Sequence, residues 1–326
     1  MNRRHLLRSA GSALALAMAV ASPPSFAQEF PSKPIHIIVP FAAAGITDIA
    51  ARLLAQKLSE RMGQPVVVEN RAGGNQIIGT EYVAKSPADG YVLIMGTMGS
   101  HAVNASLRKD LKFSVKDDFA PVSLVTSQPL ILVVNPTLNV TNLAQLIAMV
   151  KAAPGKYTFG SAGVGTSAHM AAELLKVKSG VNIVHVPYKG SGPMLIDLIG
   201  GQIDMAFDYA PTALPQIKGG RLKALAVTGA KRSDFAPELP AMAEVIPGFR
   251  VTAWQGMFAP AKTPQPVMDR LNAEIQAVMR LPEVVARMRE LGAEPVGNAR
   301  DEFVKFVGSE IDQWADIIKV NSIQAD

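Results

Sequence analysis

The sequence predicts an α/β protein in which short buried strands alternate with helices. Near-continuous apolar runs of strand length recur along the chain, and stretches with apolar residues at helical spacing separate them. Strands that are apolar on both faces are typical of sheets covered by helices on both sides. The chain has 326 residues and no cysteine. It can therefore bury a large core without disulfide bonds, and its length fits two domains of about 100–200 residues.

The first residues have the pattern of a cleavable export signal. A basic stretch, RRHLLR, precedes an apolar run over 10–21 and a Pro/Ser-rich exit. The small residues Ser25 and Ala27 predict cleavage near Ala27, a signal peptide over 1–27 and a periplasmic mature protein. The apolar run is shorter than a membrane span, which takes about 20 residues, and an uncleaved anchor is the alternative. The basic stretch matches a twin-arginine signal only in part, so Sec and twin-arginine export both stay open.

Removing the signal changes the charge of the protein. The whole chain has 32 Lys and Arg and 27 Asp and Glu, a formal charge of +5. Three of the basic residues and none of the acidic ones lie in 1–27, so 29 remain against 27, a charge of +2. The excess of basic over acidic residues therefore comes mostly from the signal peptide. The composition of the mature chain gives no support for nucleic-acid binding.

Predicted strands and helices alternate along the mature chain. Predicted strands cover 35–41, 66–69, 91–96, 131–134, 158–159, 183–186, 203–207 and 222–228. Predicted helices cover 47–62, 142–151, 167–177, 194–199, 266–279, 282–291 and 300–319. This order indicates parallel or mixed sheets flanked by helices, and no repeat of 20–50 residues suggests a solenoid.

Two strand–loop–helix units, 39–52 and 159–174, resemble each other although they lie far apart in the chain. Each has a loop of small residues before a helix, with candidate N-caps at Thr47 or Asp48 in the first and Thr166 or Ser167 in the second. The first-turn amides of each helix then point into the loop, where the helix dipole favours an anion. Ligands of open α/β sheets bind beyond the carboxyl ends of the strands, so two such termini could hold the two ends of one small anion. In the alternative interpretation these are ordinary tight turns in which glycine and alanine serve packing only.

Backbone donors suffice for such a ligand without a cationic side chain, and neither loop contains Lys or Arg. A hydrogen bond to a charged group contributes about 1.5–3 kcal/mol and a helix terminus about 0.3–1 kcal/mol more. Micromolar binding requires about 8 kcal/mol net, which three or four such contacts approach.

The motifs of common enzymes are absent. The sequence has no G-x-S-x-G, Walker A, complete G-x-G-x-x-G or H-E-x-x-H motif. His36 and His185 lie in strand-like runs and are predicted to be structural. A serine hydrolase using Ser161 or Ser167 with His169 is conceivable but lacks a nucleophile elbow and a placed acid. The spacing of His101 and His169 in the sequence does not match a pattern of metal ligands, so it does not support a metal site that includes them. We therefore predict no enzymatic activity, no cofactor and no metal site.

Six segments, in the same order, resemble one known family. They are PFAAAGITDIAAR, VVVENRAGG…IGTEYVAKSPADGYVLIMGT, GSAGVGTSAHMAAEL, VPYKGSGPMLIDLIGGQIDMAFD, KGGRLKALAVTGAKR and WQGMFAPAKTP. Over about 34–297 the sequence is similar to the Bug family of periplasmic receptors, the substrate-binding proteins of tripartite tricarboxylate transporters. The resemblance implies a two-lobed type II periplasmic-binding-protein fold with crossing hinge strands. Lobe 1 would consist of 28–126 plus 228–326 and lobe 2 of 127–227, with 222–228 as a return crossing.

The resemblance also implies where a ligand binds. One carboxylate would be held by the loop 40–48 through backbone amides and ordered water, and the loop 161–167 would complete the site. The predicted ligand-binding residues are Pro40, Phe41, Ala42, Ala43, Ala44, Gly45, Thr47, Asp48, Thr97, His101, Asn104, Ser161, Ala162, Gly163, Gly165, Thr166, Ser167, Asp208 and Gln255. Asp48 is expected to cap its helix while pointing away from the anion, and Trp254 is interpreted as a packing residue.

Two departures from the family pattern bear on this site. Family members often have two glycines where this chain has Ala44 and Gly45, and the added methyl group would narrow the pocket. The segment RAGGNQIIG departs from the usual glycine-rich run at Asn75 and Gln76.

The leading functional hypothesis is a receptor that captures a small mono-, di- or tricarboxylate, including an aromatic one, and delivers it to integral membrane transporter subunits. A monomer is expected, because the receptor must open and close. The second hypothesis is a sensing module that presents its closed form to a membrane sensor without transport. The serine hydrolase is the third.

Overall fold

The computed structural model describes residues 30–43 and 45–325 of the chain. The predicted signal peptide, 1–27, and Ala44 lie outside the described residues. Lys33–Asp326 pack as one compact unit. Among the described residues, no helix combines the length and the apolar character that crossing a membrane requires.

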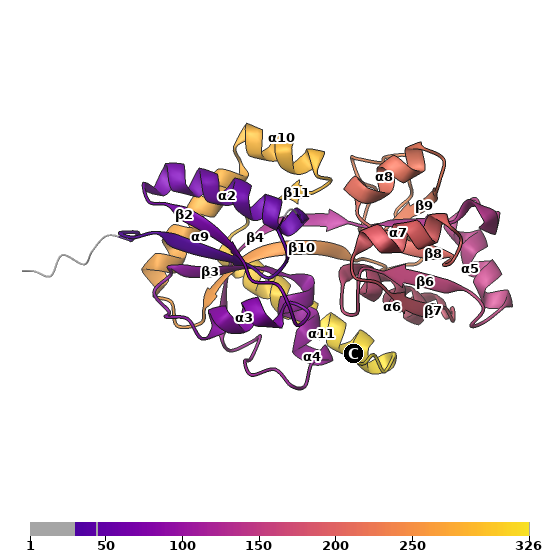
Figure 1. The fold of residues 1–326 in the computed structure, drawn as a ribbon, viewed down its shortest axis with the longest axis horizontal. Helices are drawn as coiled ribbons and strands as arrows, with labels where there is room; N and C mark the ends of the chain where they lie inside the picture. Colours follow the sequence, from indigo (N-terminus) through magenta and orange to yellow (C-terminus); the bar gives the residue numbers. More distant parts are fainter. Residues whose placement is uncertain (1–29, 44, 326) are drawn as a thin grey trace, which may run out of the picture. The chain divides into compact units, whose positions relative to one another are not determined.

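One mixed sheet of six strands forms the centre of the first lobe (Figure 1). Its strands are β1 (Ile35–Val39), β2 (Val66–Asn70), β3 (Val92–Thr97), β4 (Phe119–Pro129), β10 (Thr252–Pro260) and β11 (Glu294–Pro295). The spatial order is β11-β4-β10-β3-β1-β2. Strand β1 pairs in parallel with β2 and β3, whereas β10 is antiparallel to both β3 and β4. We call this sheet and the helices packed on it the first lobe.

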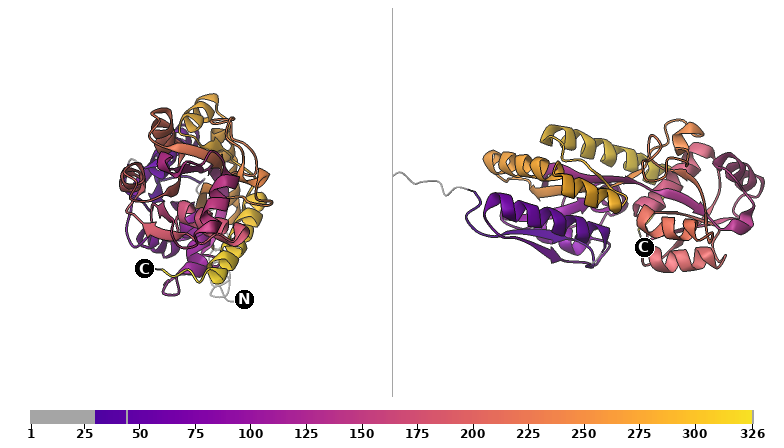
Figure 2. Two further views of the ribbon diagram at one scale, coloured as in Figure 1. Left: turned by 90° about the vertical axis from the view of Figure 1, so that its right-hand side faces the viewer. Right: turned by 90° about the horizontal axis from the view of Figure 1, so that it is seen from above.

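Helices cover both faces of this sheet. They are α2 (Ile46–Met62), α3 (Ile77–Ala84), α4 (Asn104–Leu107), α9 (Gln265–Met279), α10 (Pro282–Glu290) and α11 (Arg300–Val320), with a short π-helical turn η1 (Gly99–Val103). Figures 1 and 2 show α2, α9 and α10 on one face and α3, α4 and α11 on the other. Helix α2 buries Ala51, Leu54, Leu58 and Met62, spaced three or four residues apart, and ends at Gly63 with a left-handed φ of 68°.

A second sheet of five strands forms the centre of the second lobe. Its strands are β5 (Ile131–Val134), β6 (Thr158–Ser161), β7 (Val184–Pro187), β8 (Met205–Asp208) and β9 (Lys223–Val227), in the order β7-β6-β8-β5-β9. Strand β6 is parallel to β7 and β8, and β5 is antiparallel to β8 and β9. The helices are α5 (Leu143–Ala152), α6 (Ser167–Ser179), α7 (Ser191–Ile199) and α8 (Ala210–Lys218), and the short 3₁₀ turns are η2 (Pro136–Leu138) and η3 (Met242–Glu244).

The chain crosses between the lobes at two places that are tied together. Leu130 alone separates β4 from β5, and the return path leads from the end of β9 to the start of β10. The Thr228 hydroxyl accepts a hydrogen bond from the Leu130 amide at 2.8 Å and donates one to the Val251 carbonyl at 2.6 Å. The two crossings are therefore joined through one buried threonine.

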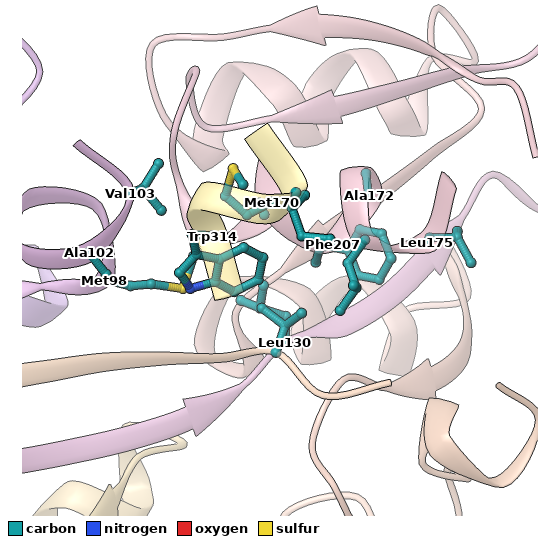
Figure 3. Close-up of a cluster of buried hydrophobic side chains, with 14 of the residues drawn as sticks. Met98, Ala102, Val103, Leu130, Met170, Ala172, Leu175, Phe207 and Trp314 are labelled. Carbon is teal, nitrogen blue, oxygen red and sulfur yellow. The ribbon is translucent and has the colours of Figure 1, made fainter. Parts of the chain in front are cut away.

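Helix α11 packs against both lobes. Figure 3 shows its Trp314 beside Met98 of the first lobe and Met170 and Phe207 of the second, all buried in one apolar cluster. Just beyond the helix, the Asn321 side-chain amide donates to the Glu173 carbonyl at 3.0 Å and to its carboxylate at 2.6 Å. The apolar core is therefore continuous from one lobe to the other.

The structure confirms the predicted alternation, since each predicted strand and helix has a counterpart. The sequence interpretation missed β4, β10, β11, α3, α4 and α8. Polar residues interrupt β4, and α8 contains Pro215, so neither shows a regular spacing of apolar residues in the sequence. In α2, Ile49 and Leu53 were expected on the buried side but are only half-buried, because the buried side runs through Ala50 and Ala51 instead.

Candidate functional site

A cavity of about 500 Å³ is lined by residues of both lobes. The first lobe contributes Phe41, Gly45, Ile46, Thr47, Ile49, Gln76, Thr97, Gly99, Ala253, Trp254, Gln255 and Leu291. The second lobe contributes Ala162, Thr166, Ser167, Ala168, Gly190, Ser191, Tyr209, Pro211 and Thr212. All of these residues have uncharged side chains at neutral pH. A cavity of this size, mostly apolar with a few polar groups, is typical of a small-molecule site.

Four helices begin at the wall of this cavity. Helix α2 begins at Ile46, α6 at Ser167, α7 at Ser191 and α8 at Ala210, and each of these residues or its neighbours lines the cavity. The first-turn N–H groups of a helix have no partner within the helix, and its N-terminus carries about half a positive elementary charge. The cavity therefore favours an anion although none of its described lining residues has a cationic side chain.

The loop before α2 differs from its prediction. The N-cap is Gly45, extended at φ −77° and ψ 166°, and no side chain caps the helix. The prediction that Thr47 or Asp48 caps α2 was therefore wrong: both lie inside the first turn. The Asp48 carboxylate, 2% exposed, accepts hydrogen bonds from Asn70 at 2.9 Å and from Arg52 at 3.0 Å. Its charge is paired within the first lobe, and the side chain does not line the cavity.

The loop before α6 is tied by its own hydrogen bonds. Thr166 is the N-cap, as predicted: its hydroxyl accepts from the His169 amide at 3.4 Å and donates to the Gly163 carbonyl at 2.7 Å. Gly163 and Gly165 have φ values of 133° and 76°, which side-chain-bearing residues rarely adopt. The Gly165 amide donates to His169 Nδ1 at 3.1 Å. The loop is therefore held in shape before any ligand arrives.

The serine–histidine pairing differs from the one considered in the sequence. Ser161 lies 2.7 Å from His185 Nε2, not beside His169, and its side chain is 0% exposed. His169 stacks on His185 with ring centres 4.1 Å apart. Burial, followed by the neighbouring charges of His185 and Lys176, lowers the pKa of His169 to about 3. These side chains form a packed layer beneath the loop, and none of them lines the cavity.

Three polar residues predicted to contact ligand lie behind the cavity wall. The His101 ring is fully buried, stacks on Phe258 at 4.0 Å and lies 2.8 Å from the Ser100 hydroxyl. The Asn104 amide donates to the Asn75 carbonyl at 3.3 Å. The Asp208 carboxylate accepts from the hydroxyls of two lining residues, Ser191 and Thr212, at 2.6 Å each, and burial raises its pKa. These residues support the wall rather than form it.

The structure thus divides the predicted ligand-binding residues into two groups. Those that line the cavity are Phe41, Gly45, Thr47, Thr97, Ala162, Thr166, Ser167 and Gln255. Those that do not are Pro40, Ala42, Ala43, Asp48, His101, Asn104, Ser161, Gly163, Gly165 and Asp208, and Ala44 lies outside the described residues. That this cavity binds the ligand stays a prediction.

The sequence interpretation missed several lining residues. Gln76 lay in a segment noted only for departing from the family pattern, and the starts of α7 and α8 were not considered as sites. Trp254, interpreted as packing, is 1% exposed and donates to the Glu310 carboxylate at 3.0 Å, yet it also forms part of the wall. The signal that could have identified α7 is the small-residue run GSG at its start, which comes shortly after strand β7 as the other two small-residue loops follow strands.

One contact joins the lobes at the rim of the cavity. The Asn75 side-chain amide, next to Gln76, donates to the Val164 carbonyl of the loop before α6 at 3.2 Å. Gly165 also packs against the first lobe, since a Cβ added there would lie 2.8 Å from Leu107 Cδ2. The structure therefore shows the two lobes in contact beside the cavity.

Comparison with known proteins agrees with this architecture. Residues 50–323 match the family described as tripartite tricarboxylate transporter family receptor, TctC. The chain is 40% identical to the protein BugT of Bordetella pertussis over 321 residues, which cover 98% of each chain. Among solved structures, it is 37% identical to Rpa4515 of Rhodopseudomonas palustris with adipate, at a TM-score of 0.80 over 89% of this chain and 98% of that one. MatC of the same organism with bound malate is 32% identical, at a TM-score of 0.77 over 89% of this chain and 100% of that one.

These likenesses cover nearly the whole of the described chain, and they hold in sequence and in structure alike. The fold is the two-lobed periplasmic-binding-protein fold expected from the resemblance, with strands that cross between the lobes. The chain is a member of the tripartite tricarboxylate transporter receptor family.

Proposed function

We propose that the protein is an exported periplasmic receptor that captures a small carboxylate between its lobes and delivers it to membrane subunits of a tripartite transporter. It binds its ligand without turning it over. The observation that carries the proposal is the convergence of the starts of α2, α6, α7 and α8 on one cavity whose described lining residues are all uncharged.

A carboxylate suits this cavity better than a cation or a neutral sugar. A carboxylate only accepts hydrogen bonds, and the helix starts offer donors that have no partner within their helices. The Phe41, Ile49 and Leu291 side chains supply apolar wall for a carbon skeleton. Charge-assisted hydrogen bonds of about 1.5–3 kcal/mol each make micromolar binding attainable with three or four donors.

Relatives support the ligand class and the transport role. The similar proteins Rpa4515 and MatC are described with adipate and with bound malate, both of them carboxylates. The family description names a transporter receptor. The predicted export signal, 1–27, agrees with a periplasmic location.

A thermal-shift panel tests the proposal. We expect at least one organic acid to raise the melting temperature, because a ligand that binds only the folded state stabilises it, by about 2.7 kcal/mol at one hundred times Kd. Glucose should leave the temperature unchanged. Native mass spectrometry of the purified protein would identify a retained ligand by its mass. If a neutral sugar shifts the melting temperature and no acid does, the proposal is wrong.

A pair of substitutions at Gly45 tests the location of the site. The atom nearest to a Cβ added at Gly45 is the Ala42 carbonyl oxygen at 3.8 Å, so Gly45→Ala fits without strain. The larger side chain of Gly45→Val would occupy space at the start of α2, where Gly45 lines the cavity. We expect Gly45→Val to abolish the acid-induced shift and Gly45→Ala to keep it, with both apo-proteins folded by circular dichroism. Full binding by Gly45→Val would show that this loop is not part of the site.

A further inference from the structure

We infer that Glu310, a buried carboxylate that does not line the cavity, is a positioning residue that couples the cavity wall to the second lobe. It ties Trp254 of the wall to Trp314, which packs against the second lobe, so that affinity for ligand depends on a residue the ligand never touches. The inference rests on the proposed function and deepens it, because it states how binding at the wall is linked to the position of the lobes.

One oxygen of Glu310 holds both tryptophans of the chain. Its Oε2 atom accepts a hydrogen bond from the Trp254 indole N–H and another from the Trp314 indole N–H, each at 3.0 Å. Glu310 is 4% exposed, and both indoles are fully buried. An indole N–H can only donate, and a buried donor without an acceptor is unfavourable. Removing the carboxylate therefore takes the acceptor from two buried donors at once.

The two tryptophans lie in different parts of the molecule. Trp254 is on β10 and forms part of the cavity wall. Trp314 is on α11, beside Met170 and Phe207 of the second lobe (Figure 3). Glu310 and Trp314 are four residues apart on α11, which is the spacing of neighbours on one face of a helix. Glu310 therefore stands between a residue of the wall and a residue that packs against the second lobe.

The other oxygen of Glu310 lies near the return crossing between the lobes. Arg250, on the path from β9 to β10, places its Nη2 atom 3.8 Å from Glu310 Oε1. The carbonyl of the next residue, Val251, accepts from the Thr228 hydroxyl, which also binds the Leu130 amide of the first crossing. The Arg250 side chain is half-exposed, so this ion pair contributes little by itself. The two indole hydrogen bonds are the stronger part of the connection.

Stability alone does not account for a carboxylate at this position. Burial raises the pKa of Glu310, and the two indole hydrogen bonds and the Arg250 charge offset that rise only in part. An apolar residue of similar volume is often as stable as a buried charge or more so. Residues that break such a rule of stability are expected at functional sites. Holding two indoles together is a function that an apolar residue cannot perform.

The connection has a defined physical consequence. When the second lobe moves relative to the first, the packing around Trp314 changes, and the shared carboxylate transmits that change to Trp254. Conversely, a ligand that packs against Trp254 favours the arrangement of the lobes in which both indole bonds are made. A ligand shifts a conformational equilibrium only through such differential contacts. Glu310 therefore contributes to affinity from outside the cavity.

Two indole N–H signals make the coupling measurable by NMR. The chain has two tryptophans, so isotopically labelled protein gives two such signals, which Trp254→Phe and Trp314→Phe assign. Met170→Leu conserves volume and alters the second-lobe packing beside Trp314. In wild-type apo-protein it should shift both signals. Glu310→Met keeps the side-chain length and removes the acceptor, and in that background Met170→Leu should shift the Trp314 signal alone.

Binding of an acid gives a second readout. The probes are malate, adipate, succinate and benzoate. A probe that binds should shift the Trp314 signal of the wild-type protein as well as the Trp254 signal, although Trp314 does not line the cavity. By isothermal titration, Glu310→Met should lower the affinity for that probe about tenfold. Glu310→Gln keeps an oxygen acceptor for the indoles and should stay within about threefold of wild type.

A matched control separates coupling from a loss of stability. Leu146 is buried in α5, a helix that contributes no described residue to the cavity wall. Leu146→Ala should lower the melting temperature at least as much as Glu310→Met and leave the affinity within about twofold of wild type. If Glu310→Met does not fold by circular dichroism, Trp314→Phe replaces it. That variant removes one of the two donors and should lower the affinity about threefold.

The outcomes distinguish the coupling from the proposed function. A probe that raises the melting temperature but shifts the Trp254 signal alone overturns the coupling and leaves a carboxylate receptor. Equal affinities of Glu310→Met and wild type also overturn it. If none of the probes and no acid of the wider panel binds, the proposed function is wrong. The apo-protein signals then still decide the coupling: a shift of both by Met170→Leu that disappears in Glu310→Met supports it, and any other pattern overturns it.

Discussion

The loop before α2 and the loop before α6 both lead from a strand to a helix start at the cavity, but they are built differently. In the first, Ala42, Ala43 and Gly45 are exposed, and the helix has no side-chain cap. In the second, a capping threonine, two left-handed glycines and a histidine hold the backbone. Similar sequence patterns have thus produced one open loop and one preformed loop.

The difference indicates how the site is assembled. A preformed loop lowers the ordering cost of binding, because its conformation is fixed in the absence of ligand. The described residues of the loop before α2 are more exposed, and no side chain caps the helix that follows, so fewer hydrogen bonds fix this loop. We therefore expect substitutions in the second loop to affect the stability of the protein, and those in the first to affect binding with little effect on stability.

The largest difference in stability is expected between two glycine-to-alanine variants, one in each loop. Gly165 has a φ of 76°, and an added Cβ would lie 2.8 Å from Leu107 of the other lobe, so Gly165→Ala should destabilise the protein by about 1–3 kcal/mol. Gly45→Ala meets no atom closer than 3.8 Å and should stay within about 0.5 kcal/mol of wild type. Urea denaturation measures both. Equal destabilisation of the two variants would remove the contrast between the loops.

Acid should destabilise the protein in part through His169 beneath the second loop. The pKa of His169 falls to about 3 in the folded protein because the ring is buried, whereas the ordinary value is 6.5. The unfolded chain therefore takes up this proton first, and stability is lost as the pH falls from 6.5 towards 3. His169→Asn should reduce the loss of unfolding free energy by about 1.4 kcal/mol per pH unit between pH 6.5 and 3. Burial also lowers the pKa of His101 to about 3, and the substitution leaves the contribution of that residue unchanged. An unchanged dependence of the unfolding free energy on pH would contradict this account.

The smallest effect is expected at the two threonines near the helix starts. Thr166 caps α6 through its hydroxyl, so Thr166→Ala should cost about 1 kcal/mol. Thr47 lies inside the first turn of α2 and makes no capping bond, so Thr47→Ala should change stability by less than about 0.5 kcal/mol. Denaturation in urea at pH 7 compares the two, and a loss at Thr47 as large as that at Thr166 would place a cap where the structure shows none.

The sequence could predict the parts of this molecule that depend on local chemistry. Apolar runs located the strands, and a threonine before an apolar helix located the cap of α6. The cap of α2 was misassigned because an extended glycine can end a loop without any side-chain signal. Asp208 was assigned to the ligand from the family resemblance, as the residue that follows the MAF strand. The structure gives it the hydroxyls of Ser191 and Thr212 instead.

The rest of the site depends on residues that are far apart in sequence and are brought together by the pairing of strands. Gln76 and Gln255 are separated in sequence by the whole of the second lobe, and the register of β10 with β3 brings them to the same wall of the cavity. Ser161 and His185 meet because β6 and β7 lie side by side, whereas the chain order suggested His169. No period or motif in the sequence specifies such neighbours, since they follow from the order of strands in the sheet.

The uncharged lining has a consequence for how the ligand leaves. Tyr209 is the one described lining residue that titrates in water, and burial raises its pKa to about 12, so the wall keeps the same charge from mildly acidic to alkaline conditions. A dependence of affinity on pH in that range then reports the ionisation of the ligand or of groups behind the wall such as Asp208, whose pKa burial raises. Under the proposed function, release of the ligand requires the lobes to separate at contacts such as that between Asn75 and Val164.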